Sequence, residues 1–214
     1  MESKIDEKYL KQTYFIDTDS ELIYDIAYEL TRDTVDPIEK AKKIFYWTRD
    51  NILYDPYSLS FMKKSYKASN IIRKARGWCV PKAVVLATLA RAVKIPSRLH
   101  FADIRNHQIT SKLKNEMGTD LFIFHGYSEL YLNNKWVKAT PAFNIELCEK
   151  FGHRPVEFDG INDAMLPKTT LDGQKHIEYI SDRGIFADLP LKHIFDVFMK
   201  VYMTAGGRIN IFSR

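Results

Sequence analysis

One stretch of the chain limits its possible folds more than any other. An apolar run over 83–90, without glycine or proline, follows the segment 77–81, which reads GWCVP. A run that is apolar on nearly all sides is typical of a buried helix. Pro81 suits the first turn of such a helix, because the N–H group it lacks would have no partner there. The sequence therefore predicts a buried helix with Cys79 at its N-terminus.

The predicted position of Cys79 has a chemical consequence. The free N–H groups and the dipole at a helix N-terminus favour negative charge, so we expect them to favour the thiolate and to lower the pKa of this thiol. The alternative is a structural role, since free cysteine often packs as a small buried hydrophobe. The second cysteine, Cys148, lies among Glu146 and Glu149, which raise a thiol pKa. We therefore expect Cys79 to be the reactive cysteine and Cys148 the inert one.

A histidine that could serve Cys79 lies further along the chain. Segment 121–132, rich in Phe and Tyr, predicts a long strand with His125 inside it. Asn133-Asn134 predicts a tight turn, after which 135–140 returns as the partner strand. Gly126 leaves room for another backbone or a ligand. A thiol at a helix start, a histidine on a strand and a polar group nearby make a thiol-nucleophile arrangement, although a histidine among aromatic residues also occurs as a packing residue.

The remaining pattern gives the order of the elements. The expected helices span 21–31, 37–52, 79–94, 144–151 and a final segment that begins after Pro190, carries an apolar stripe on one face and ends at Gly206-Gly207. The expected strands span 97–102, 121–132, 135–140 and 175–180. The expected loops are 55–76, 104–119 and 153–170. Helices first, then mostly antiparallel strands, then a helix describe an α+β fold.

These residues resemble a known family, the transglutaminase-like superfamily, which has a papain-like core. The resemblance covers about 36–144 and rests on segments that follow one another in the family's order: 37–41, 52–55, 77–79, 91–98, 125–132 and 136–141. It implies an α+β fold in which the nucleophile helix packs on an antiparallel β-sheet. We expect 1–214 to form a single transglutaminase-like domain, with its core at about 36–144 and helical additions at both ends.

The resemblance also implies the roles of individual residues. Cys79 is the expected nucleophile and His125 the expected base, and the backbone N–H of Cys79 is the expected oxyanion donor. Trp78 and Tyr127 are the candidate substrate-binding residues, with packing as the alternative role for Trp78. The expected chemistry is cysteine-dependent acyl transfer at an amide of a peptide or protein, through a thioester. Water would release the acyl group in a peptidase or amidase, and an amine in a transglutaminase or other acyltransferase.

One position departs from the family pattern. The residue before the proline of the last strand is normally Asp in the family, and here it is Thr140. A neutral hydroxyl stabilises an imidazolium less than a carboxylate does. Thr140 and Asn144 are the candidates to orient His125, with Asp103 and Asp159 as remoter substitutes. The departure also supports the alternative function, a catalytically weak or inactive peptide-binding module on the same fold.

Composition excludes some other classes of protein. The net charge of +5 permits contact with polyanions, but the basic residues within 63–76 accompany no nucleic-acid-binding motif, so nucleic acid is not an expected partner. No stretch approaches the ~18 apolar residues of a membrane span, and the N-terminus is polar, so we expect a cytoplasmic location. Two cysteines form no disulfide framework and have no metal-ligand spacing. The expected acyl chemistry implies neither a metal nor an organic cofactor.

Overall fold

The structure is a computed structural model that describes residues 5–206. Its helices are α1 (Glu21–Thr31), α2 (Pro37–Asn51), α3 (Ala68–Lys74), α4 (Cys79–Ala92), α5 (Ser111–Met117), α6 (Ile145–Phe151) and α7 (Leu191–Thr204), with two 3-10 turns, η1 (Glu7–Tyr9) and η2 (Lys63–Tyr66). Its strands are β1 (Leu53–Tyr54), β2 (Arg76–Gly77), β3 (Ser97–Asn106), β4 (Leu121–Leu132), β5 (Lys135–Ala139) and β6 (Ile177–Phe186).

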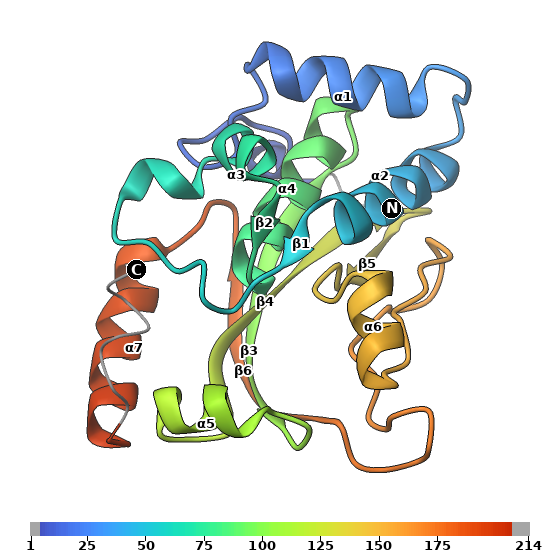
Figure 1. Ribbon diagram of the computed structural model, residues 1–214. Helices are drawn as coiled ribbons and strands as arrows, with labels where there is room; N and C mark the ends of the chain where they lie inside the picture. Colours follow the sequence, from blue (N-terminus) through green and yellow to red (C-terminus); the bar gives the residue numbers. More distant parts are fainter. Residues whose placement is uncertain (1–4, 207–214) are drawn as a thin grey trace.

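The centre of the fold is a four-stranded antiparallel sheet with the buried helix α4 against it. The strand order is β5-β4-β3-β6, and α4 packs on β4 and β3 while α1, α2 and α3 pack around α4 (Figure 1). Every residue of α4 from Cys79 to Arg91 is buried, as the apolar sequence predicts. Helices α5 and α7 lie near the end of the sheet that points away from α1 (Figure 1). The predicted α+β architecture, a nucleophile helix on an antiparallel sheet, is confirmed.

Helix α2 begins as its sequence predicts and is tied to α4 at its far end. The side chain of Asp36 accepts a hydrogen bond from the N–H of Ile38, with Pro37 in the first position. At the other end, the Lys82 ammonium of α4 donates to the carbonyl of Arg49 at 2.8 Å and to that of Ile52. A cation suits the C-terminal carbonyls of a helix. Burial lowers the pKa of Lys82 to about 7.

The hairpin of β4 and β5 is confirmed, including its turn. Asn133 and Asn134 have φ angles of 47° and 63°, the left-handed values that a two-residue hairpin turn with the right twist requires. Strand β5 ends at Ala139, which pairs with Ser128 of β4. The pairing with β5 therefore ends at Ser128, which lies three residues along β4 from His125. Thr140 is not placed opposite the histidine.

Three segments differ from the sequence-based expectation. The predicted loop 55–76 contains η2 and α3, and the predicted irregular segment 104–119 contains the end of β3 and the helix α5. Both helices are seven residues long and bury only two or three side chains each, so hydrophobic periodicity is too short to reveal them. The extended segment expected at 175–180 is the start of the longer strand β6.

The final helix confirms its predicted apolar stripe. Leu191, Ile194, Phe198 and Tyr202 of α7 are buried, and the helix ends at Thr204, close to the expected stop at Gly206-Gly207, of which Gly207 lies outside the described residues. Between residues 5 and 206, no helix combines the length and the apolar character needed to cross a membrane.

Candidate active site

The start of α4 lies directly against β4, and a glycine makes this approach possible. A Cβ atom on Gly126 would lie 2.9 Å from Cγ2 of Val80, a distance that real Cβ atoms essentially never show, and 3.0 Å from its Cα, which is tighter than most such contacts. The absence of a side chain at Gly126 therefore brings Cys79, the first residue of α4, beside the strand that carries His125. The room that the sequence predicts beside Gly126 is filled by the backbone of Val80.

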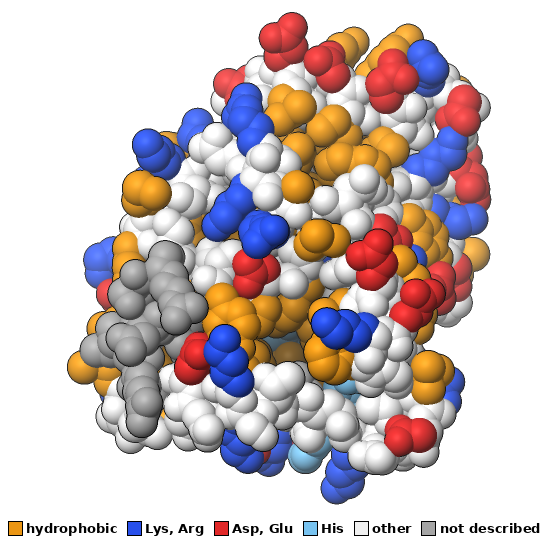
Figure 2. All heavy atoms as spheres, in the orientation of Figure 1, with side chains coloured by type: hydrophobic (Ala, Val, Ile, Leu, Met, Phe, Trp, Pro, Cys, Tyr) orange, Lys and Arg blue, Asp and Glu red, His pale blue; other side chains and the backbone are white. Residues whose placement is uncertain are grey.

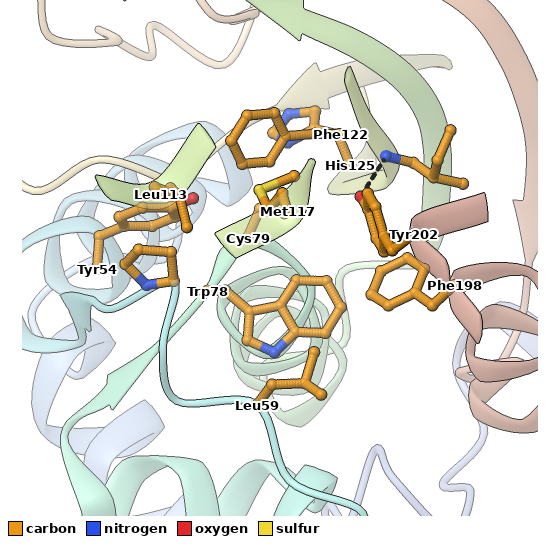
Figure 3. A pocket seen from close by; sticks show the side chains of 12 residues that line it. Tyr54, Leu59, Trp78, Cys79, Leu113, Met117, Phe122, His125, Phe198 and Tyr202 are labelled. Atoms are coloured by element: carbon orange, nitrogen blue, oxygen red, sulfur yellow. Dashed lines mark hydrogen bonds between the residues drawn. The ribbon is translucent and has the colours of Figure 1, made fainter. Parts of the chain in front are cut away.

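Cys79 and His125 line the same hollows in the protein. They share a cavity of about 60 Å³ with α5 and α7, and a smaller one of about 10 Å³ on the side of Asn106. Figure 3 shows the larger cavity, with the thiol of Cys79 and the ring of Phe122 near His125. Figure 2 shows hydrophobic side chains gathered in the hollow above α5, with charged residues around its rim. The structure thus brings the two predicted reactive residues to one apolar site.

The thiol and the imidazole are both neutral in this closed site. Burial raises the pKa of Cys79 to about 11, although the N–H groups of Gly126, Val80 and Cys79 itself, hydrogen-bonded to the sulfur, pull it down. Burial lowers the pKa of His125 to about 3. The N–H groups at the helix N-terminus thus lower the thiol pKa as expected, but the expected net lowering is wrong for this state, because desolvation of the thiolate outweighs them. Burial also raises the pKa of Cys148 to about 11, so the two thiols do not differ in acidity. They differ in that Cys79 lines the two cavities and Cys148 lines neither.

His125 follows an irregularity in β4 that the sequence does not reveal. Ala102 of β3 pairs with His125 and Ile104 pairs with Phe122, so two residues of β4 lie opposite Asp103 alone. One of them, Phe124, has a φ of 55°, which is costly for a bulky side chain. Such a bulge re-aims the side chains that follow it, and bulges are common next to active sites.

A buried carboxylate holds this bulge in place. Asp103 accepts a hydrogen bond from the N–H of Phe124 at 3.1 Å and from the hydroxyl of Ser181 at 3.0 Å. Its charge is paired with Arg183, whose Nη2 lies 2.6 Å from Oδ2. The guanidinium of Arg183 also lies over the Phe124 ring, 5.2 Å from its centroid. Asp103 therefore acts on the backbone next to His125 and not on the imidazole.

The two residues predicted to orient His125 make their hydrogen bonds elsewhere. Asn144 accepts from the N–H of Tyr54 at 3.1 Å and so fixes β1. The buried hydroxyl of Thr140 donates to the sulfur of Met165 at 3.7 Å. Among residues 5–206, neither side chain is hydrogen-bonded to the imidazole, and Nε2 of His125 is buried without a hydrogen-bond partner.

The remoter carboxylates do not supply this partner either. The carboxylate of Asp159 accepts from the N–H groups of Ile161 and Asn162 in its own loop. The ring of Tyr179 stands edge-on to that of His125, at an angle of 70° and with their centroids 6.0 Å apart, so it limits the orientation of the imidazole by packing. The imidazole of His125 is therefore held by packing, without a hydrogen-bonded third member in the described part of the chain.

The two predicted substrate-binding residues lie in different surroundings. Trp78 lines the larger cavity and packs against Phe198 of α7, with ring centroids 5.6 Å apart. Tyr127 is buried between His100 and His125, with centroids 4.7 Å and 6.2 Å away, and it lines neither of the two cavities. The structure thus places Trp78 at the site and Tyr127 behind the histidine.

Sequence reasoning missed most of the walls of the larger cavity. They come from segments far apart in the chain: Tyr54, Pro56 and Leu59 before α4, Leu113 and Met117 of α5, Phe122 and Ile123 of β4, and Phe198 and Tyr202 of α7. The one available signal was the apolar stripe of α7, which needs a surface to cover. Within the described residues, no group of three or more His, Cys, Asp or Glu side chains is placed to hold a metal ion.

Comparison with known proteins finds one matching family and similar solved structures. The family model of the transglutaminase-like superfamily matches residues 24–141, more than half of the chain. A proposed cysteine protease from Cytophaga hutchinsonii matches with 15% identity and a TM-score of 0.49, over 83% of this chain and 53% of its own. A proposed protease from Parabacteroides distasonis matches with 17% identity and a TM-score of 0.40, over 63% of this chain and 25% of its own.

The chain therefore spans about half the length of the first of these proteins and a quarter of the second. No curated protein matches its sequence. The family match covers α2, α4 and the strands β3 to β5, and so includes both Cys79 and His125. The chain belongs to the transglutaminase-like superfamily.

Proposed function

We propose that this protein is a cysteine-dependent hydrolase that cleaves an amide of a peptide or protein through a thioester on Cys79. The observation that carries the proposal is the meeting of the Cys79 thiol and the His125 imidazole at one cavity, at the N-terminus of a buried helix. Membership of a family that contains transglutaminases supports it. The reacting groups are a thiol, an imidazole and backbone N–H groups, which together suffice for acyl transfer.

The reaction starts from the neutral pair. The sulfur of Cys79 attacks the substrate carbonyl while its proton passes to His125, because burial disfavours a thiolate–imidazolium pair before substrate binds. The backbone N–H of Cys79 stabilises the negative oxygen of the tetrahedral intermediate. His125 then gives its proton to the leaving amine as the C–N bond breaks. Water adds to the thioester, the acid leaves and the thiol of Cys79 is restored.

Hydrolysis is the form of acyl transfer that the site supports best. Transfer to an amine requires a second site that admits the amine and excludes water. The two hollows at Cys79 measure about 60 Å³ and 10 Å³, and the smaller one is too tight for an amine side chain beside a bound acyl group. Water needs no such site.

The test is the formation of a covalent intermediate. We expect incubation with an activated acyl ester to add the acyl mass to Cys79, and the adduct to be lost in Cys79→Ala and strongly slowed in His125→Ala. The control is Cys148→Ala, because Cys148 is buried and lines neither hollow. Acylation of Cys148 in place of Cys79 would show that the assignment of the nucleophile is wrong.

A second function, a peptide-binding module without turnover, is favoured by one observation. The position that carries Asp in the family holds Thr140, and Nε2 of His125 has no hydrogen-bond partner in the described structure. A binding module would retain peptide affinity in Cys79→Ala and would show neither adduct nor product. Release of a cleaved or deamidated peptide by the unaltered protein would exclude it.

A further inference from the structure

We propose that the 60 Å³ cavity is the subsite for the acyl side chain of the substrate and that it selects compact aliphatic chains. This inference rests on the proposed function of Cys79. The cavity opens beside the nucleophile and is enclosed by side chains from the segment before α4, from α5 and from α7 (Figure 3). A substrate whose carbonyl carbon lies at the sulfur of Cys79 would place its side chain in this space.

The chemistry of the walls excludes polar side chains. Among residues 5–206, no Lys, Arg, Asp or Glu lines the cavity. Of its two tyrosines, Tyr202 accepts a hydrogen bond from the N–H of Ile123 at 3.0 Å (Figure 3), and burial raises the pKa of both Tyr54 and Tyr202, so both stay neutral. A carboxylate or carboxamide that binds here would lose its hydrogen bonds to water and would form few hydrogen bonds to the cavity walls. An aliphatic chain forms no hydrogen bonds with water, so it has none to lose when it enters the cavity.

The size of the cavity limits the length of the chain. A buried water needs about 10–15 Å³ of such a cavity, so about 60 Å³ holds about four to six groups of that size, and somewhat fewer of the larger methyl and methylene groups. A branched side chain of three or four carbons fills this volume. A longer chain would meet Trp78 and Phe198, whose rings pack against each other. We therefore expect an optimum near the 3-methylbutanoyl group.

A series of p-nitrophenyl esters tests this selectivity. In each, the S–C bond forms as the C–O bond breaks, p-nitrophenolate leaves and the thiol proton passes through His125 to solvent. We expect the 3-methylbutanoate to acylate Cys79 at least about tenfold faster than the acetate and the charged monosuccinate, after each rate is divided by that of the ester with free N-acetylcysteine. The octanoate should also react more slowly than the 3-methylbutanoate.

A pair of methionine variants tests the location of the subsite. Met117, on α5, lines the cavity, so Met117→Ala should enlarge it and move the optimum toward longer chains. The matched control is Met203→Ala, because Met203 is 53% exposed on α7 and lines no part of the cavity. We expect the control to keep the preference of the unaltered protein.

The outcomes separate this inference from the proposed function. Acylation of Cys79 at equal relative rates by all four esters, or an optimum that Met117→Ala leaves in place, would overturn the subsite while the nucleophile stands. Absence of any adduct on Cys79 would overturn the proposed function. In that case protection of Cys79 from iodoacetamide by 3-methylbutanamide, and not by succinamate, would still support the cavity as an apolar ligand site, and equal protection would overturn it.

Discussion

The carboxylate of Asp103 controls the geometry of His125 from the neighbouring strand without touching the imidazole. Its hydrogen bond to the N–H of Phe124 and its pairing with Arg183 hold a backbone conformation that Phe124 would not adopt alone. Asp103 does not take over the role of the carboxylate that the family has at position 140, here Thr140. It fixes the backbone of Phe124 and offers no charge to an imidazolium. Two positions at this scale lead to testable predictions.

The first prediction concerns Asp103 itself. Asp103→Ala removes the acceptor of Phe124, so His125 shifts and Cys79 acylation falls by about 10- to 100-fold. Asp103→Asn keeps an oxygen for the N–H and should restore part of the rate, which a merely structural loss would not do. The measurement is the acylation rate at a temperature where urea titration shows each variant folded. The control is Asp120→Ala, which removes a partly exposed partner of Arg105 and Lys114. Similar rates for Ala and Asn would contradict a role through the backbone.

The second prediction concerns Gly126. Gly126→Ala places a Cβ 3.0 Å from Cα of Val80, so the start of α4 has to move away from β4. We expect a loss of about 1–3 kcal/mol in the free energy of unfolding, the usual cost of overpacking, together with slower acylation of Cys79. The control is Gly152→Ala, where a Cβ meets nothing within 4 Å and only the φ of 65° opposes the change. Unchanged acylation in Gly126→Ala would show that this contact does not position the thiol.

At the scale of secondary structure, sequence predicts the long elements and misses the short ones that shape the site. Helix α4 and the β4–β5 hairpin follow from apolar patterns of eight or more residues and from Asn133-Asn134. Helix α5 buries only Leu113 and Met117, so its periodicity is unreadable, although Thr110 and Gly118 mark its two ends. The bulge at Phe124 has no sequence signal, because nothing in the residue type favours a left-handed backbone.

The third prediction concerns the anchoring of α5. The hydroxyl of Thr110 accepts a hydrogen bond from the N–H of Leu113, so Thr110→Ala should destabilise this short helix by about 1 kcal/mol. Because α5 supplies one wall of the cavity, we expect faster hydrogen exchange over 111–117 and faster alkylation of Cys79 by iodoacetamide. Thr110→Ser, which keeps the hydroxyl, should behave like the unaltered protein. Faster exchange without faster alkylation would show that α5 does not limit access to the thiol.

At the scale of the whole molecule, buried neutral histidines link stability to pH. The rings of His153 and His176 pack with centroids 4.0 Å apart, and burial lowers the pKa of both, that of His176 to about 4. His125 also stays neutral. The unfolded chain takes up protons near pH 6.5, whereas the folded chain does so only at lower pH. The free energy of unfolding is therefore unaffected by these groups above pH 6.5 and falls as the pH drops below it.

The fourth prediction follows from the size of this effect. The depressed pKa of His176 alone corresponds to a loss of up to about 3 kcal/mol between pH 6.5 and 4. Urea unfolding at pH 7 and pH 4.5 measures it, and we expect His176→Phe to lose less stability on acidification than the unaltered protein. The control is His107→Phe, which changes a histidine at the surface and leaves the buried pair intact. An equal acid sensitivity in His176→Phe would show that other groups dominate.

The pairing of β3 is irregular on its other side as well, at the outer edge of the sheet. Strand β6 is the last strand, and its pairing with β3 shifts register twice, between Phe101 and Ala102 and between Asp103 and Ile104. A regular, flat edge strand is a template on which another polypeptide can extend a sheet and start aggregation. The interrupted edge of β6, with the exposed carboxylate of Asp182 among its residues, is a poor template of this kind. The irregular edge of β6 thus guards the protein against fibrous self-assembly.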